Sequence, residues 1–189
     1  MKYEDIKTPK ELAEFINNNI NYGFVDDNGK VYDSSNEEEF EEGCKTKWKL
    51  SSPKRLIEVG YGHCFDQVEL ERDWFTRNGY EVKTYFIWFE LDYENTYSMH
   101  TYLVYKDKDE YFYFEHSDAT NRGIYKFNSY NNAIKYQKNN HIEYNKRFNP
   151  VGDDELKKLH IYEYEKPKYG SSFYEFIDFI LDEGIIKDV

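Results

Sequence analysis

Apolar positions recur along the sequence with two periods, one typical of helices and the other of strands. Three segments repeat apolar residues at spacings of three and four, which places them on one broad face of a helix. These residues are Leu12, Phe15, Ile16 and Ile20, then Phe65, Val68, Leu70, Trp74 and Phe75, and last Phe173, Phe176, Ile177 and Ile180. Residues 8–11, Thr-Pro-Lys-Glu, form a capping box that predicts the start of the first helix.

Aromatic and β-branched runs predict strands at 80–91, 100–105, 111–115, 123–127 and 159–165. Weaker signals predict a hairpin or loop at 22–32, an acidic helix or loop at 36–42, a short helix at 53–59, a polar connection at 92–97, and helices at 130–138 and 172–182. Because helices come first and mostly antiparallel strands follow, the predicted class is α+β. No repeat or linker divides the sequence, so residues 1–189 are expected to form one domain.

Charge and hydropathy narrow the functional classes. The net charge of −12 argues against binding to a nucleic-acid backbone, which requires basic patches. The mean hydropathy is −0.96, no stretch has the length of a membrane span, and the first residues lack an apolar signal core. Two cysteines, Cys44 and Cys64, do not make a disulfide framework. A cytoplasmic protein without membrane contact is therefore expected, and its oligomeric state stays open.

Cys64 lies where a reactive thiol is expected, at the start of the middle helix. The unpaired amides and dipole of a helix N-terminus lower the pKa of a cysteine. Asp66 falls in the first turn, where the dipole favours a carboxylate, and Gly62 permits a tight turn before the helix. The acidic residues of this helix fall largely away from its apolar face; they are Asp66, Glu69, Glu71 and Asp73.

The two strands of a hairpin, at 100–105 and 111–115, are predicted to bring His100 and Glu115 together. If Asp107 and Lys108 are the loop of a hairpin, Lys106 faces Asp109, and opposed residues have numbers that sum to 215. That register pairs His100 with Glu115, at a Cβ separation of about 4.5–5.5 Å. Asp118 would face the other way in a regular strand, so it is the reserve candidate for the acidic residue.

These residues also carry a resemblance to a known family. The segments at 62–67 (Gly-His-Cys-Phe-Asp-Gln), at 74–82 (Trp-Phe-Thr-Arg-Asn-Gly-Tyr-Glu-Val) and at 111–115, together with His100, resemble the bacterial branch of the transglutaminase-like superfamily. The similarity is greatest over 60–127, about a third of the chain. Two features depart from the family pattern: Glu115 stands where Asp is more usual, and Thr101-Tyr102 stands where many relatives have Ala-Trp.

The resemblance implies a papain-like core, at about 48–127, in which the nucleophile helix packs on a mostly antiparallel sheet. It implies a Cys64-His100-Glu115 triad that acts on a peptide or protein substrate, at a Gln or Asn side chain or at a peptide bond. Cys64 would form a thioester, and either water or an amine would resolve it, giving peptidase, deamidase or cross-linking activity. No cofactor or metal is expected. The alternative is an inactive member of the family that binds peptides.

Less specific interpretations compete with this site. A single cysteine near a helix start is often a buried structural residue. A zinc site would draw on Cys44, His63, Cys64, His100 and His116, but these lack a close ligand pair. His63 is expected to be a loop residue rather than a base, because neighbours in sequence point apart. Trp48 is either part of an oxyanion pocket or, more simply, a core residue, and the acidic run at 37–42 is expected to be a solvated face rather than a calcium site.

Overall fold

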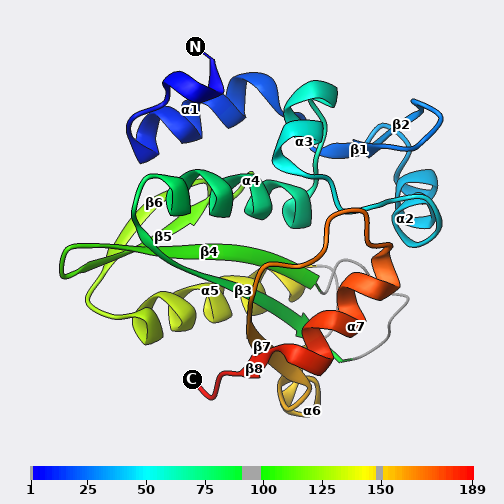
Figure 1. Cartoon of the computed structure of the whole chain (residues 1–189). Coiled ribbons are helices and arrows are strands. Elements are labelled where there is room, and N and C mark those ends of the chain that lie inside the picture. Colours follow the sequence, from blue (N-terminus) through cyan, green and yellow to red (C-terminus); the bar gives the residue numbers. More distant parts are fainter. Residues whose placement is uncertain (1, 91–98, 148–150) are drawn as a thin grey trace.

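The computed structural model describes residues 2–90, 99–147 and 151–189. Its strands are β1 (Gly23–Val25), β2 (Val31–Asp33), β3 (Glu81–Phe89), β4 (Met99–Asp107), β5 (Glu110–Glu115), β6 (Gly123–Phe127), β7 (Leu159–Tyr164) and β8 (Ile185–Ile186). β1 pairs with β2, and the other strands form one antiparallel sheet in the order β6-β5-β4-β3-β7-β8 (Figure 1). The predicted α+β class is confirmed, and the predicted connection at 92–97 lies outside the described residues.

The helices begin where the sequence offers capping residues. They are α1 (Pro9–Asn19), α2 (Glu37–Thr46), α3 (Pro53–Val59), α4 (Cys64–Arg77), α5 (Tyr130–Asn145), α6 (Asp153–Leu156) and α7 (Phe173–Glu183), with a 3₁₀ turn, η1, at Tyr3–Asp5. Thr8 and Ser172 form capping boxes at α1 and α7, and Asn36 and Ser52 cap α2 and α3. No helix among the described residues has the length and apolar character needed to span a membrane.

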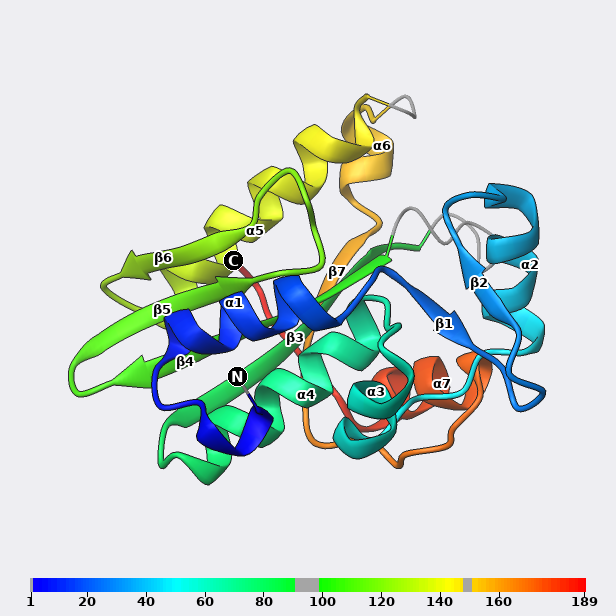
Figure 2. The same cartoon turned by 90° about the horizontal axis from the view of Figure 1, so that it is seen from above.

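The sheet separates two layers of helices (Figures 1 and 2). On one face α4 packs directly on the strands, and α1 and α3 pack over α4 through a cluster that includes Leu12, Leu56 and Phe75. α7 lies on the same face, where Phe176 joins a cluster with Phe65 of α4 and residues of β3. α5 covers the opposite face. The core is therefore built largely from the aromatic residues of the chain, which bury a large area each.

Three acidic residues of α4 are buried instead of lying on an exposed face. Asp66, Glu69 and Glu71 are at most 2 % exposed, because the sheet, α3 and α1 surround most of the helix. Glu69 pairs with Arg72 at 3.2 Å. An apolar stripe locates one buried face of a helix but does not show how many other faces are also covered.

The β4–β5 hairpin has a different register from the one predicted. Asp107 pairs with Glu110 and Leu103 with Phe114, so opposed residue numbers sum to 217, and the loop residues are Lys108 and Asp109. Lys108 has a φ of 55°, the left-handed conformation that tight hairpin turns require. Each residue of β4 thus faces a partner two positions further along than expected. A shift of two preserves the face, so His100 and Glu115 still lie on the same side of the sheet.

Other elements were only partly predicted. α5 continues to Asn145, seven residues beyond the predicted end at 138, and α6, β8 and η1 were not predicted. The apolar spacing that marks the first half of α5 weakens after residue 138, where buried positions such as His141 and Asn145 are polar. Periodicity does not detect a buried polar residue, so the predicted helix stopped too early.

We expect Phe75→Ala to lower the free energy of unfolding by about 3–5 kcal/mol, because a large ring is lost from a closed core. Phe75 is fully buried and stacks on Tyr105 at a centroid distance of 4.2 Å. Urea denaturation measures the change. Ile185→Ala is the control, since Ile185 is 62 % exposed and its truncation should stay within about 0.5 kcal/mol. A loss below about 1 kcal/mol for Phe75→Ala would contradict this packing.

Candidate active site

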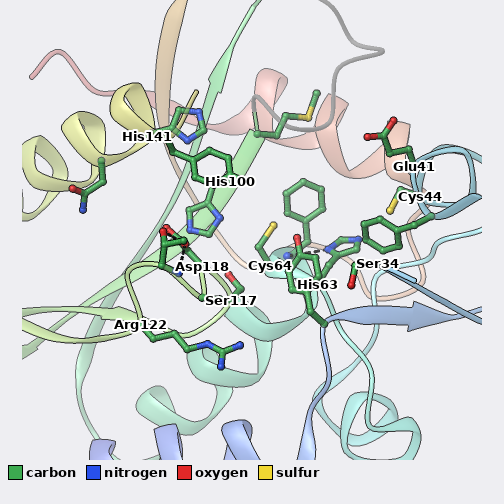
Figure 3. A pocket seen from close by; sticks show the side chains of 18 of the residues that line it. Ser34, Glu41, Cys44, His63, Cys64, His100, Ser117, Asp118, Arg122 and His141 are labelled. Carbon is green, nitrogen blue, oxygen red and sulfur yellow. Dashed lines mark hydrogen bonds between the residues drawn. The ribbon is translucent and has the colours of Figure 1, made fainter. Parts of the chain in front are cut away.

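A pocket of about 420 Å³ opens at the end of the sheet where β4 begins and β5 ends. Its lining includes both cysteines and three histidines, His63, His100 and His141 (Figure 3). The β4–β5 ladder extends from Asp107↔Glu110 to Leu103↔Phe114, so the two strands are no longer paired where they reach the pocket. Side chains from α4 on one face and from α5 on the other can therefore meet there.

Cys64 is the first residue of α4, as predicted, and the chain before it is tightly packed. His63 is the N-cap residue: its Nδ1 accepts a hydrogen bond from the Phe65 N–H at 3.3 Å. A Cβ atom at Gly62 would lie 2.4 Å from Leu56 Cδ1 and 3.0 Å from Asp66 Cβ, so any other residue here would have to displace these buried side chains. The thiol thus lies among the unpaired amides of the first turn.

Asp66 anchors the start of this helix. Its buried carboxylate accepts hydrogen bonds from the Ser51 N–H at 2.8 Å, from Trp48 Nε1 at 3.0 Å and from the His63 N–H at 3.3 Å. Trp48 is 2 % exposed and its N–H is used by Asp66, so it is a core residue and not a donor to the pocket.

His100 and Glu115 are in contact although they are not directly opposed. His100 Nε2 lies 2.8 Å from Glu115 Oε2. Continuing the observed register would place Tyr102 opposite Glu115, so His100 lies on the diagonal, a longer span than that between directly opposed residues. The extra methylene of glutamate helps to cover this distance. Because Nε2 of His100 is bound to Glu115, Nδ1 is the ring nitrogen that remains for Cys64.

Glu115 is well supplied with hydrogen-bond donors. Oε2 also accepts from the Tyr113 hydroxyl, and Oε1 accepts from the Asp118 N–H at 2.8 Å and from Ser117 Oγ at 3.2 Å. The reserve candidate, Asp118, supports Glu115 through its backbone, while its own carboxylate accepts from the N–H and hydroxyl of Thr120. The carboxylate that holds His100 is therefore that of Glu115.

The electrostatics of the site favour a thiolate beside an imidazolium. Burial raises the pKa of the Cys64 thiol, but hydrogen bonding and electrostatic interaction with His100 and His63 lower it to about 6. Burial lowers the pKa of His100, yet Glu115 and Cys64 raise it well above its usual range. Burial raises the pKa of Glu115, but His100 and the Asp118 N–H outweigh this and lower it.

Two residues of the pocket were not predicted to take part. His63, expected to be a loop residue, is 4 % exposed and hydrogen-bonds toward both Cys44 and Cys64. Tyr22 also lines the pocket, with its hydroxyl within hydrogen-bonding reach of Cys64. The N-cap position of His63 could have indicated that its ring folds back over the first turn. For Tyr22 the sequence offers no such signal.

The zinc interpretation finds no support in the described part of the chain, where no group of three or more His, Cys, Asp or Glu side chains could hold a metal ion. His116 instead donates a hydrogen bond from Nδ1–H to Gln67 Oε1 at 3.0 Å. The acidic run at 37–42 lies within the first turns of α2, where Asn36 caps the helix.

Comparison of the chain with protein-family models, with curated proteins and with solved structures found no match. The functional argument therefore depends on the geometry of the pocket itself. In that geometry a buried low-pKa thiol contacts an imidazole, and the imidazole contacts an ionised carboxylate. Nucleophilic catalysis by cysteine requires this arrangement.

We expect Glu115→Gln to lower the pKa of His100, because the Glu115 carboxylate is the main group that raises it. NMR titration of the His100 ring protons measures the change: the ring should lose its proton at a lower pH than in the native protein. Asp118→Asn is the matched control, since its carboxylate binds Thr120 and not the ring. An equal or larger fall in Asp118→Asn would show that Asp118 supplies the charge.

Proposed function

We propose that this protein is a cysteine-dependent acyltransferase or hydrolase that acts on carboxamide or amide groups through a thioester. The observation that carries the proposal is the contact series from Cys64 to His100 to Glu115 at the base of one pocket. A nucleophile helix that packs on an antiparallel sheet, with the histidine on β4 and the acid on β5, supports a transglutaminase-like, papain-like core. A peptide or protein side chain is the proposed substrate.

In the first half-reaction the Cys64 sulfur attacks the carbonyl carbon, and the carbonyl π electrons move to the oxygen. The electron pair on the oxygen then reforms the C=O bond as the C–N bond breaks, and His100, which holds the proton of the thiol, passes it to the departing ammonia or amine. The acyl group remains on sulfur as a thioester. Glu115 keeps the ring in place and offsets the positive charge on it.

In the second half-reaction an acceptor enters where the ammonia or amine departed. His100 removes a proton from water or from an amine, the acceptor attacks the thioester carbon, and the sulfur leaves as a thiolate stabilised by the imidazolium. Water gives hydrolysis or deamidation, and an amine gives a new amide. The backbone N–H of Cys64, at the start of α4, is in position to serve as one oxyanion donor.

We expect Cys64 to react with iodoacetamide well below pH 8, with half of its maximal rate near pH 6, the pKa that His100 and His63 confer. Below that pH the thiol is protonated and the rate falls. In His100→Ala the midpoint should move up toward about 8.5, the ordinary value for cysteine. Peptide mass spectrometry measures the extent of alkylation at Cys64 and at Cys44 separately in the same sample.

Slow modification of both thiols at neutral pH would contradict the proposal. It would favour the inactive, peptide-binding alternative, because a binding module has no need of a low-pKa thiol.

We expect Glu115→Gln to fold normally and to lose about 10–10³-fold in activity, less than the roughly 10⁴-fold measured when the acid of a Ser-His-Asp triad becomes an amide. A Cys–His pair already carries its charges before substrate reacts, so it depends less on the third residue. Turnover of 4-nitrophenyl acetate measures the loss, and Cys64→Ala sets the background. If Asp118→Asn lost activity while Glu115→Gln kept it, the role given to Glu115 would be wrong.

A further inference from the structure

Two imidazole rings flank the sulfur of Cys64. Figure 3 shows His100 on one side of the sulfur and His63 on the other, with Cys44 beyond His63. Both rings hydrogen-bond toward the thiol. The proposed reaction uses only His100, so the ring on the opposite side has no role yet. That side is where the carbonyl oxygen of a substrate would point when its leaving group faces His100.

His63 is held more rigidly than a loop residue would be. Its ring lies 4.8 Å from Trp48 and 4.9 Å from Phe65, centroid to centroid, and it is 4 % exposed. The backbone N–H of His63 is bound to Asp66, and its Nδ1 is bound to the Phe65 N–H. The ring is therefore fixed before any substrate arrives, which is the condition for strong electrostatic stabilisation of a transition state.

The hydrogen bonds also decide which nitrogen of His63 carries a proton. Burial lowers the pKa of His63, whereas Asp66 and the two thiols raise it well above its usual range. An Nδ1 that accepts the Phe65 N–H must be unprotonated, and this bond is shorter than the 3.7 Å between Nδ1 and the Asp66 carboxylate. The ring then keeps its proton on Nε2. Since a doubly protonated ring also has an Nε2–H, this nitrogen is a donor in either state.

Other side chains near the sulfur are less suited to donate to an oxyanion. The Trp48 N–H is bound to Asp66, and the Gln67 amide donates to the Gly62 carbonyl at 2.7 Å. The Tyr22 hydroxyl also hydrogen-bonds toward Cys64 and lies inside the pocket, although the residue as a whole is 41 % exposed. We favour His63 because Trp48, the Phe65 ring and the Phe65 N–H hold its ring from several sides, and Tyr22→Phe tests the other donor.

We infer that His63 is a second catalytic histidine, whose Nε2–H, together with the backbone N–H of Cys64, stabilises the oxyanion of the tetrahedral intermediate. This inference rests on the proposed function. His100 and His63 then do different work: the first moves a proton, and the second donates a hydrogen bond and keeps its proton. The hydrogen-bond partner of each ring decides where its proton lies. His100 is bound to a carboxylate, and His63 is bound to a backbone N–H.

A comparison of two reagents separates this role from an effect on the thiolate. Iodoacetamide alkylates sulfur by displacing iodide, and no oxyanion forms. 4-Nitrophenyl acetate is attacked at its carbonyl carbon; the oxygen gains the electron pair, the C=O bond then reforms, 4-nitrophenolate leaves and the acetyl group stays on sulfur. Both rates are measured at pH 9.5, where the thiolate is fully formed, and the ratio of acylation to alkylation at Cys64 is the readout.

The variants are chosen to keep the helix cap. His63→Asn retains an acceptor for the Phe65 N–H but is too short to reach the substrate oxygen, whereas His63→Gln has a donor with a longer reach. We expect the ratio to fall roughly 10²-fold in His63→Asn and to recover partly in His63→Gln, in line with the loss of one oxyanion donor. His160→Asn is the control: this histidine of β7 is partly exposed beside Glu90 and does not line the pocket, so both rates should stay unchanged.

Several outcomes would overturn the inference. If the ratio of acylation to alkylation is unchanged in His63→Asn, His63 is not an oxyanion donor. If Tyr22→Phe selectively loses acylation while His63→Asn does not, Tyr22 is the donor in place of His63. If the native protein alkylates slowly at neutral pH and is not acylated at all, the proposed function itself fails. If the native protein reacts as proposed but the ratio is unchanged in His63→Asn, only the role of His63 is wrong. The two failures are therefore distinguishable.

The native protein offers an independent test should His63→Asn not fold. Acetaldehyde adds to a reactive thiol as a hemithioacetal, which places an oxygen where the oxyanion would form. The Nε2–H proton of His63 should then move downfield in the NMR spectrum, and the ring should stay in the same tautomer. No change at His63 while Cys64 is modified would overturn the inference.

Discussion

The buried carboxylate of Asp66 fixes where α4 begins, and the geometry of the pocket depends on that point. It binds the N–H groups of Trp48, Ser51 and His63, which belong to the segment that precedes the helix. Those bonds hold the chain before the helix in place, where Gly62 packs closely on Leu56, and bring His63 to the N-cap position. Cys64 then has to be the first helical residue. Burial raises the pKa of Asp66, and the groups that donate to its carboxylate oppose that rise, so the carboxylate and the segment before the helix stabilise each other.

Glu115 plays the corresponding part on the sheet side of the pocket. Its donors come from β4, from Tyr113 of β5 and from the loop at 117–118, so it ties the end of β5 to the start of β4 where the ladder has stopped. The Tyr113 hydroxyl oxygen also lies 2.8 Å from the side-chain amide of Gln137 of α5, which connects the site to the opposite layer of helices. An aspartate would span less of the diagonal to His100. A glutamate at position 115 thus fits the observed register better than an aspartate would.

The sequence predicted most elements and the contact between His100 and Glu115, although from a register that was wrong by two positions. The face was right because side chains alternate with period two, so an even shift leaves each residue on its side. The turn residues Lys108 and Asp109 carry no glycine that would have located the loop. His63 was missed because two neighbours in sequence point apart in an extended chain, whereas an N-cap residue folds its side chain back over the first turn. Burial of Glu69 and Glu71 depends on tertiary packing, which no local pattern contains.

A chain with a net charge of −12 still provides a pocket in which a thiolate is stable, and the reason is local. Glu71 lies on the same face of α4 as Cys64, two turns away, and an ionised carboxylate there would oppose the thiolate. Burial and the nearby Glu115 instead raise the pKa of Glu71 well above its usual range, which disfavours its ionised form. The charge of Glu115 is offset by His100. His100 and His63 lower the pKa of Cys64, and the carboxyl groups around them are either paired or disfavoured as anions, so little negative charge opposes the thiolate.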